Sequence, residues 1–160
     1  MNDKVRARFN AQLYAPEEMC SYKDTADFFW VTDHGTRGRI DMVVYSFPYV
    51  SGRTFTLDYL VAMRDSVWEN IYRGVSRFLY DDRKRLPSYE AISKNGEYCG
   101  VVRGLWEMEG DMMGGPFVSH AHLDEKNQRV VVAETFVYAP GTKKAKLLRR
   151  GEASLYTFCM

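Results

Sequence analysis

Hydrophobic residues alternate with polar ones along much of the chain, and this period of two predicts β-strands. Alternation at Phe9, Ala11 and Leu13 predicts a first strand that ends at Pro16. Two further strands are expected on either side of the turn DHGTRG, Asp33–Gly38, where they form a hairpin: Ala26–Thr32 and Arg39–Phe47. The second half of the chain predicts four more strands: Tyr89–Ser93, Tyr98–Met108, Phe117–Leu123 and Arg129–Tyr138.

Two segments have the period of a helix instead. Thr56 is a suitable N-cap, and Gly74 is a suitable end for the first helix. Between them lies one apolar stripe at helical spacing, formed by Leu57, Leu60, Val61, Val67, Trp68 and Ile71. The polar stretch Val75–Pro87 follows as a connection, and Thr142 is expected to cap a final helix that runs to about Phe158.

These elements give the order β-β-β-α-β-β-β-β-α. Strands joined by tight turns, with two helices among them, predict an α+β fold in which both helices pack on an antiparallel sheet. The length of 160 residues suits one domain. We therefore expect a single domain over residues 1–160, with residues 1–8 as a lead-in.

Composition narrows the class of protein. The chain is 46% hydrophobic and 27% charged, which is typical of a globular protein. Its net charge of +1 argues against a nucleic-acid binder, and the basic clusters at residues 83–85 and 143–150 are expected to be solvated. No apolar run has transmembrane length and the first residues do not resemble a signal peptide, so we expect the chain as given to be soluble.

The segment GDMMGGPFVSHAHLDEKN, Gly110–Asn127, contains a pair of histidines. On a strand, His120 and His122 point to the same side and could both reach one metal ion. Further ligands would be needed, and the candidates are His34, Asp124, Met112 and Met113. None has a diagnostic spacing. We expect the two histidines to face water, with Phe117, Ser119, Ala121 and Leu123 facing the core, and we predict no metal and no other cofactor.

Arg64 falls in the apolar stripe of the first helix. A guanidinium there needs a partner, because an unpaired buried charge is very costly. Glu134 or Glu107 could supply a carboxylate, which would make Arg64 part of a structural ion pair. The alternative is an arginine that faces a ligand.

Acidic residues alternate near the end of the long strand, at Glu107, Glu109 and Asp111. Such carboxylates can act as acid and base when one pKa is shifted, but at an exposed strand end we expect them to be solvated. The usual catalytic motifs are absent from the sequence. Cys99 and Cys159 have no histidine beside them in the sequence and are expected to be buried structural cysteines. A third cysteine, Cys20, makes a full disulfide framework impossible.

Several phrases resemble a bacterial family that carries a domain of unknown function. They are DFFWVTD, VVYSFPY, FTLDYLVAMRDSV, RGLWEMEGDMMGGPFVSHAHLDEKNQRVV and TFVYAPG. The resemblance extends from about Phe9 to Phe158, and RGLW…MGGPFVS is its most specific part. Members resemble two-part hypothetical proteins or lipoproteins, which implies a cell-envelope location and an upstream domain with a lipid anchor ahead of this region. The element order also resembles the PsbP-like fold, whose members mostly bind partners.

Our leading hypothesis is a non-catalytic envelope domain that binds a protein partner or an envelope component. Tyr49, Met112 and Met113 lie in Gly/Pro-punctuated loops and have side chains that interfaces favour, so we predict them as contacts. The alternative is a small-molecule-binding protein or hydrolase, with a cleft near Arg64, Arg103, Trp106 and Glu107. A purely structural domain of a larger lipoprotein is a third hypothesis.

Overall fold

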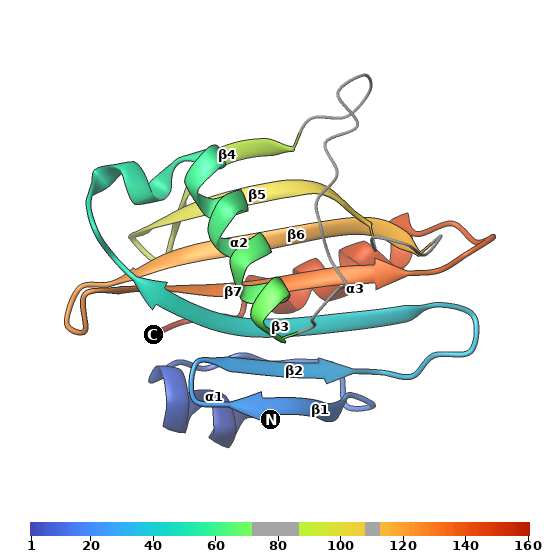
Figure 1. The fold of residues 1–160 in the computed structure, drawn as a ribbon. Helices are drawn as coiled ribbons and strands as arrows, with labels where there is room; N and C mark the ends of the chain where they lie inside the picture. The colour runs from blue at the N-terminus through green and yellow to red at the C-terminus, as the bar shows by residue number, and fades with distance from the viewer. Residues whose placement is uncertain (72–86, 108–112) are drawn as a thin grey trace.

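A seven-stranded antiparallel sheet forms the centre of the molecule (Figure 1). The computed structural model describes residues 1–71, 87–107 and 113–160. The strands are β1 (Cys20–Thr25), β2 (Phe28–Thr32), β3 (Arg39–Pro48), β4 (Ser88–Lys94), β5 (Glu97–Glu107), β6 (Gly114–Asp124) and β7 (Arg129–Tyr138). They lie in the order β1-β2-β3-β7-β6-β5-β4, so β1 and β4 are at the edges.

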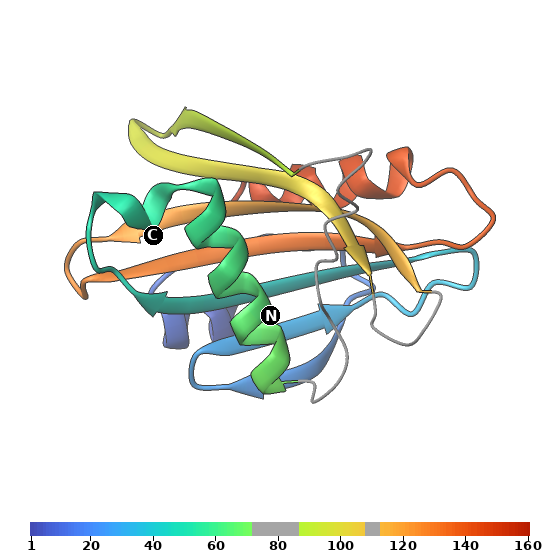
Figure 2. The same ribbon diagram turned by 45° about the horizontal axis from the view of Figure 1, so that its top comes forward.

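Helices cover both faces of this sheet. Helix α2 (Leu57–Ile71), which follows the short 3₁₀ helix η1 (Gly52–Phe55), lies across one face (Figures 1 and 2). Helices α1 (Asn2–Phe9) and α3 (Ala145–Leu155) lie on the other. We call these the α2 face and the α3 face. None of the helices in the described ranges is long and apolar enough to cross a membrane.

Each face has its own hydrophobic core. On the α2 face, Leu60, Val61 and Trp68 of the helix pack against inward residues of the sheet such as Trp30 and Phe136. On the α3 face, Val5, Phe9 and Leu155 pack against a second set that includes Val118 and Val131. Because both sets are buried, the central strands are apolar on both sides instead of alternating between core and water.

The predicted α+β class and antiparallel sheet are confirmed. The hairpin around Asp33–Gly38 pairs Phe28 with Tyr45 and Thr32 with Asp41, as the alternation predicts. Helix α2 begins one residue after Thr56, whose hydroxyl accepts a hydrogen bond from the Tyr59 N–H at 3.4 Å. Its predicted end at Gly74 and nearly all of the connection that follows lie outside the described residues.

The N-terminal prediction was wrong. Residues 2–9 form helix α1 in place of a lead-in, so the described part of the chain contains three α-helices where two were expected. Phe9, Ala11 and Leu13 are all buried, but Gln12 makes only an isolated bridge with Cys159. The period of two therefore located buried positions without identifying the element, and β1, at Cys20–Thr25, was not predicted.

The start of the C-terminal helix differs from expectation, and the structure shows why one glycine of β6 is needed. Helix α3 begins at Ala145, after the N-cap residue Lys144, and the Thr142 hydroxyl donates to the Arg37 carbonyl instead of capping the helix. Gly115 lies within β6, where a Cβ atom would be 2.0 Å from the Val137 carbonyl oxygen. Close approach of two backbones, not a turn, therefore requires this glycine.

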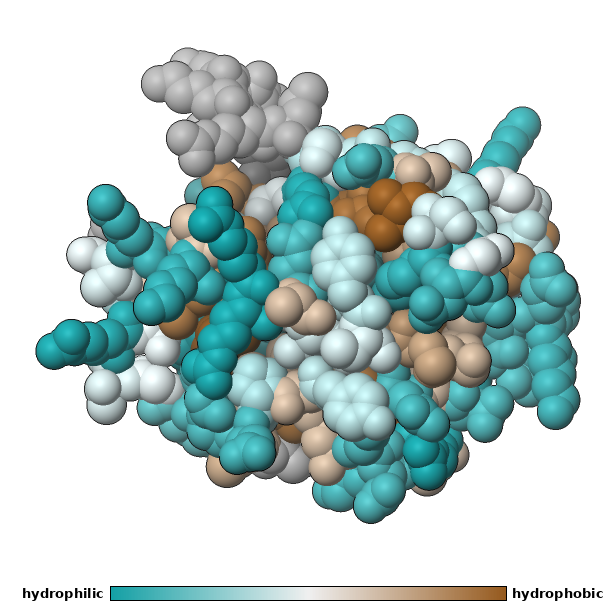
Figure 3. All heavy atoms as spheres, turned by 180° about the vertical axis from the view of Figure 1, so that it is seen from behind, coloured by the Kyte–Doolittle hydropathy of each residue, from teal (hydrophilic) through white to brown (hydrophobic). Residues whose placement is uncertain are grey.

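The surface over α3 is largely hydrophilic (Figure 3).

A buried ion pair attaches α2 to the centre of the sheet. The Arg64 Nε donates to both carboxylate oxygens of Glu134 on β7, at 2.8 and 2.7 Å, and its Nη2 also donates to this carboxylate. The side chains are 3% and 0% exposed. The guanidinium carbon also lies 4.4 Å from the ring centroid of Phe117. The guanidinium of Arg64 thus makes charge-assisted hydrogen bonds to a carboxylate and a cation–π contact with an aromatic ring.

We predict that removing either charge of this pair alone destabilises the protein strongly. Arg64→Met leaves the Glu134 carboxylate buried without its cation, and such a change costs about 3–5 kcal/mol of the free energy of unfolding. The double variant Arg64→Met/Glu134→Met removes both charges and should recover most of that loss. Chemical denaturation of the three proteins measures the difference.

The matched control is Arg103→Met. Arg103 pairs with Glu152 of α3 but is 40% exposed, and exposed pairs contribute at most about 1 kcal/mol. An Arg64→Met variant as stable as Arg103→Met would contradict the role assigned to the buried pair.

Candidate functional site

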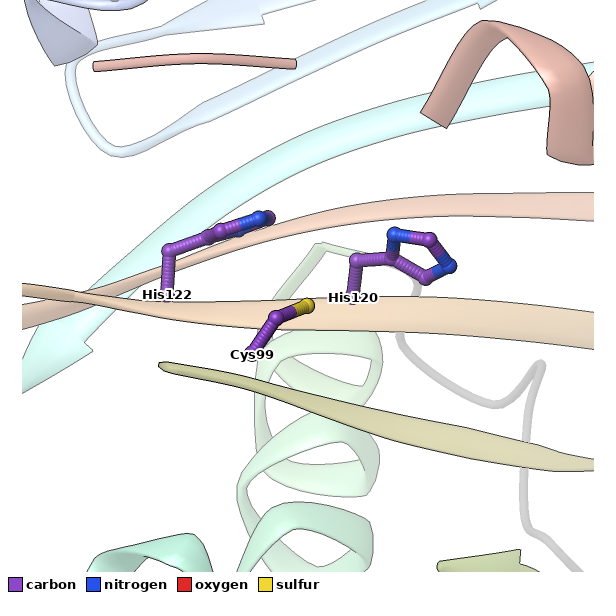
Figure 4. A group of neighbouring side chains, drawn as sticks. All are labelled: Cys99, His120 and His122. Carbon is purple, nitrogen blue, oxygen red and sulfur yellow. The ribbon is translucent and has the colours of Figure 1, made fainter. Parts of the chain in front are cut away.

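Three side chains that can bind metals meet on the α3 face (Figure 4). Cys99 lies on β5 directly opposite His122 on β6, and His120 is two residues from His122 on the same strand. Side chains paired across antiparallel strands, and those two apart on one strand, share a face. Each residue offers one ligand atom, and these atoms all lie within 4.8 Å of one another.

This cluster is fully enclosed. Cys99 and His120 are 0% exposed and His122 is 4% exposed. The last residues of the chain cover the two rings: Tyr156 is edge-on to His120 with 5.0 Å between centroids, and Phe158 is 4.6 Å from His122. The prediction that the histidines face water was therefore wrong, because α3 and the C-terminal residues cover the side of β6 that alternation assigns to solvent.

The imidazole nitrogens are poorly satisfied. Within the described ranges, no hydrogen bond of normal length and angle reaches His120 Nε2 or either ring nitrogen of His122, although the backbone at Val131 and at His120 lies close enough to His122 to oppose part of the fall in its pKa. The Nδ1 atom of His120 lies 3.3 Å from the Lys94 amine, which also donates to the Leu155 carbonyl at 2.9 Å. Buried polar atoms are normally paired, so unpaired nitrogens here require an explanation.

The protonation of the cluster follows from its burial. Desolvation lowers the pKa of His120 and of His122 to about 3, and the nearby Lys94 charge adds to both effects. Burial also raises the pKa of the Cys99 thiol to about 11. At neutral pH the site therefore contains two neutral imidazoles and a neutral thiol.

A neutral thiol beside neutral imidazoles is unsuited to nucleophilic catalysis. A catalytic cysteine needs a lowered pKa, usually beside a protonated histidine, and access to its substrate. Here both pKa changes have the opposite sign and the sulfur is buried. What the arrangement offers instead is a set of uncharged sulfur and nitrogen ligands.

Sequence reasoning missed Cys99 as a member of this cluster. Its burial was predicted correctly, but the pairing of Cys99 with His122 depends on strand register, which the sequence pattern alone did not give. Three of the other candidate ligands do not join the site: His34 is exposed in its turn, the Asp124 carboxylate binds Asn127 and Arg129, and Met113 packs on the α2 face. The fourth, Met112, lies outside the described residues. Cys159 is exposed, contrary to prediction, and Cys20 is exposed as well.

The four residues expected around a cleft lie in different parts of the molecule. Arg64 is beneath α2, whereas Arg103 pairs with Glu152 on the α3 face. Trp106 is buried and donates its indole N–H to the Val137 carbonyl at 3.1 Å, and Glu107 is exposed. The cavity beside Arg64 has a volume of about 10 Å³, room for roughly one water molecule. Within residues 1–71, 87–107 and 113–160, these four side chains do not line a common cleft.

The predicted partner contacts are partly exposed. Tyr49 is half-buried and its ring lies 6.3 Å from that of Phe55. Met113 is also half-buried and packs against the core of the α2 face. Met112 lies outside the described residues.

Burial of two neutral histidines predicts a stability that depends on pH. Both histidines take up protons below about pH 6.5 in the unfolded chain but only near pH 3 in the fold. The free energy of unfolding should thus be insensitive to them above pH 7 and fall as the pH drops below 6.5, by up to about 2.7 kcal/mol per pH unit.

Urea denaturation between pH 4.5 and 7.5 measures this slope against a variant with His120→Gln and His122→Gln. The variant should lose that part of the slope, whereas His34→Gln, at an exposed position, should retain it. Equal slopes for all three proteins would contradict the assignment of neutral buried histidines.

Solved structures support the PsbP-like fold that the element order predicts. The Ran-binding protein Mog1p of Saccharomyces cerevisiae superposes with a TM-score of 0.55 at 10% identity, over 93% of this chain and 89% of Mog1p. A point mutant of the protein Mog1 gives 0.51 at 9% identity, over the same shares of the two chains. A Bacteroides thetaiotaomicron structure matches with a TM-score of 0.45 and 13% identity, over 93% of this chain and 44% of the other.

No curated protein matches the chain in sequence. The family match covers residues 1–157, nearly the whole chain, and it agrees with the resemblance found in the motifs. The chain belongs to the DUF4837 family, a domain of unknown function.

Proposed function

We propose that this chain is a non-catalytic binding domain that recognises a protein partner through an aromatic surface. This surface consists of Tyr49, Phe55, Tyr89 and Tyr98. It lies where η1 meets the β4–β5 hairpin on the α2 face. The residues come from four separate segments of the chain, which the fold brings together.

The observation that carries the proposal is the continuity of these rings with the exposed ring of Tyr98, since Tyr49, Phe55 and Tyr89 are half-buried and pack against the core of the α2 face. The ring of Phe55 lies 6.3 Å from that of Tyr49 and 5.2 Å, edge-on, from that of Tyr98. The hydroxyl groups of Tyr89 and Tyr98 are hydrogen-bonded to each other. Tyr98 is 48% exposed, and the neighbouring Val50 is 72% exposed.

Rings held in this way suit protein recognition. Tyrosine and phenylalanine provide large contact areas with few rotatable bonds, and they are enriched at interfaces and among the residues that dominate binding energy. Tyr98 also borders an open depression of about 480 Å³ that Leu123 and Met160 line from the other side. A partner could thus place an apolar side chain beside Tyr98 while its backbone crosses the aromatic surface.

The other polar groups support a binding role over a catalytic one. Among the described residues, the buried carboxylates of Glu134 and Asp41 are both engaged, the first by Arg64 and the second by Arg39 and the Trp30 indole. Both carboxylates are also fully buried, and a general acid or base must lie within hydrogen-bond reach of its substrate. Mog1p, which has the same fold, is a Ran-binding protein, and this likeness is consistent with a binding role here as well.

The proposal includes the cell envelope as the location, on the basis of the family resemblance alone. Fractionation of the native cells, with detection of the full-length protein in cytoplasmic and envelope fractions, tests it. Recovery of the protein in the cytoplasmic fraction would contradict the proposed location. It would not bear on the proposed role of the aromatic surface.

Site-specific photo-crosslinking tests the aromatic surface. A benzophenone amino acid at position 98 should give one discrete adduct in the native cells, and mass spectrometry identifies the partner. The same probe at position 14 is the control, because Tyr14 is 61% exposed but lies beside Thr157, away from the surface.

Binding of the identified partner should then weaken at least about tenfold in Tyr98→Ser, a typical effect for an aromatic interface residue, and stay unchanged in Tyr14→Ser. Circular dichroism verifies that both variants fold. The same adduct from both positions, or unchanged binding by Tyr98→Ser, would contradict the proposal.

A further inference from the structure

We propose that Cys99, His120 and His122 form a binding site for a cuprous ion, Cu⁺. The site lies on the α3 face, whereas the aromatic surface lies on the α2 face, so the two proposals stand independently. It is distinct from the two-histidine site considered from the sequence, because a thiol supplies the third ligand.

The ligand atoms are close to binding distance already. Metal bonds of about 2.0–2.1 Å to imidazole nitrogen and about 2.3 Å to thiolate place ligand atoms roughly 3.3–3.8 Å apart. In the fold these atoms all lie within 4.8 Å of one another. A contraction of about 1 Å, within reach of small side-chain rotations, would bring the three onto one ion.

The ion would also satisfy two of the orphaned nitrogens. Both histidines are neutral at physiological pH, which is the form that binds metals. No hydrogen bond of normal length and angle reaches His120 Nε2 or the two nitrogens of His122 within the described ranges. An ion bound to His120 Nε2 and to one nitrogen of His122 would give two of these three buried atoms a partner in place of the hydrogen bonds they lack.

Charge favours a monovalent ion over a divalent one. Binding removes the Cys99 proton, which leaves for solvent as the Cu–S bond forms, so the Cu⁺–thiolate unit is neutral overall. Zn²⁺ with the same thiolate would leave one positive charge in a buried site whose nearest charged group, Lys94, is itself a cation 3.3 Å from His120 Nδ1. An uncompensated buried charge of this kind is costly.

The number and type of ligands agree with this choice. Structural zinc is almost always bound by four protein ligands, and among the described residues the cluster provides three. Sulfur and imidazole ligands suit both copper and zinc, and a set of three ligands favours Cu⁺, which is stable with three.

The C-terminal residues provide an entry route. The cover over the histidines, Tyr156 and Phe158, precedes Cys159, which is held to Gln12 by two backbone hydrogen bonds of 2.7 and 3.1 Å. Opening the chain end would also break the hydrogen bond between the Tyr14 N–H and the Thr157 hydroxyl and expose the buried ring of Phe158, but it would leave the pairing of the sheet strands in place. Ions could therefore exchange through local opening of the chain end.

Metal titration of the purified full chain tests the site. Cu⁺, kept reduced by ascorbate and competed with a chromogenic cuprous chelator, should bind at one ion per chain and raise the melting temperature. One proton should be released per ion, so the affinity should rise with pH. Cys99→Ser and His122→Gln should each lose at least about 100-fold in affinity, since even residues behind the ligands cost 10–100-fold.

Cys20→Ser and His34→Gln are the matched controls, because both positions are exposed, and they should bind as the wild type does. If the cluster variants fail to fold, X-ray absorption on the wild-type protein decides the question through one sulfur and two imidazole ligands. Three results would overturn the proposal: no binding at one ion per chain, a spectrum without sulfur, or zinc bound at these residues in preference to Cu⁺.

Discussion

The contact between Arg64 and Glu134 is the constraint on which the rest of the structure depends. Two opposite charges are buried together at the centre of the sheet, where either alone would be strongly destabilising. Burial raises the pKa of Glu134 and the Arg64 guanidinium opposes that rise. Because the carboxylate comes from β7 and the guanidinium from α2, the pair fixes both the position and the rotation of the helix on the sheet.

This constraint gives the two faces of the sheet different characters. On the α2 face, the charges are matched and the adjacent cavity is no larger than a water molecule, so little remains there for a ligand beneath the helix. On the α3 face, neutral histidines and a neutral thiol are buried without charge partners. The first face holds the fold together and presents aromatic rings at its rim. The second holds groups that can bind metals, and burial extends the pH range over which these groups stay neutral.

The sequence predicted much of this arrangement. The predicted strands include six of the seven that the structure shows, all but β1, and the 33–38 hairpin. The position of Arg64 in an apolar stripe led to the expectation of a carboxylate partner, with Glu134 as one candidate. These predictions succeeded because they rest on local periodicity and on the high cost of a buried charge. The predicted helix end at Gly74 and the acidic residues Glu109 and Asp111 lie outside the described residues, so the structure does not test these predictions.

The failures also have a common physical cause. Alternation reports that every second residue is buried, but it does not reveal what covers the intervening residues. His120 and His122 were assigned to solvent because nothing in the strand itself indicates that α3 and the chain end pack over them. Likewise, Phe9, Ala11 and Leu13 were read as a strand when their burial comes from a helix and an extended segment. Cys99 could not be assigned to the histidines without the register between β5 and β6.

We propose that the metal-binding groups lie on the α3 face, whereas the buried Arg64–Glu134 pair on the α2 face stabilises the fold. Anomalous diffraction from crystals grown with Cu⁺ under reducing conditions tests it directly. The account predicts one anomalous peak bonded to the Cys99 sulfur and to a nitrogen of each histidine, with the Arg64–Glu134 pair unchanged. A structure without a peak between these residues, or with a bound molecule at Arg64 in place of the carboxylate, would contradict it.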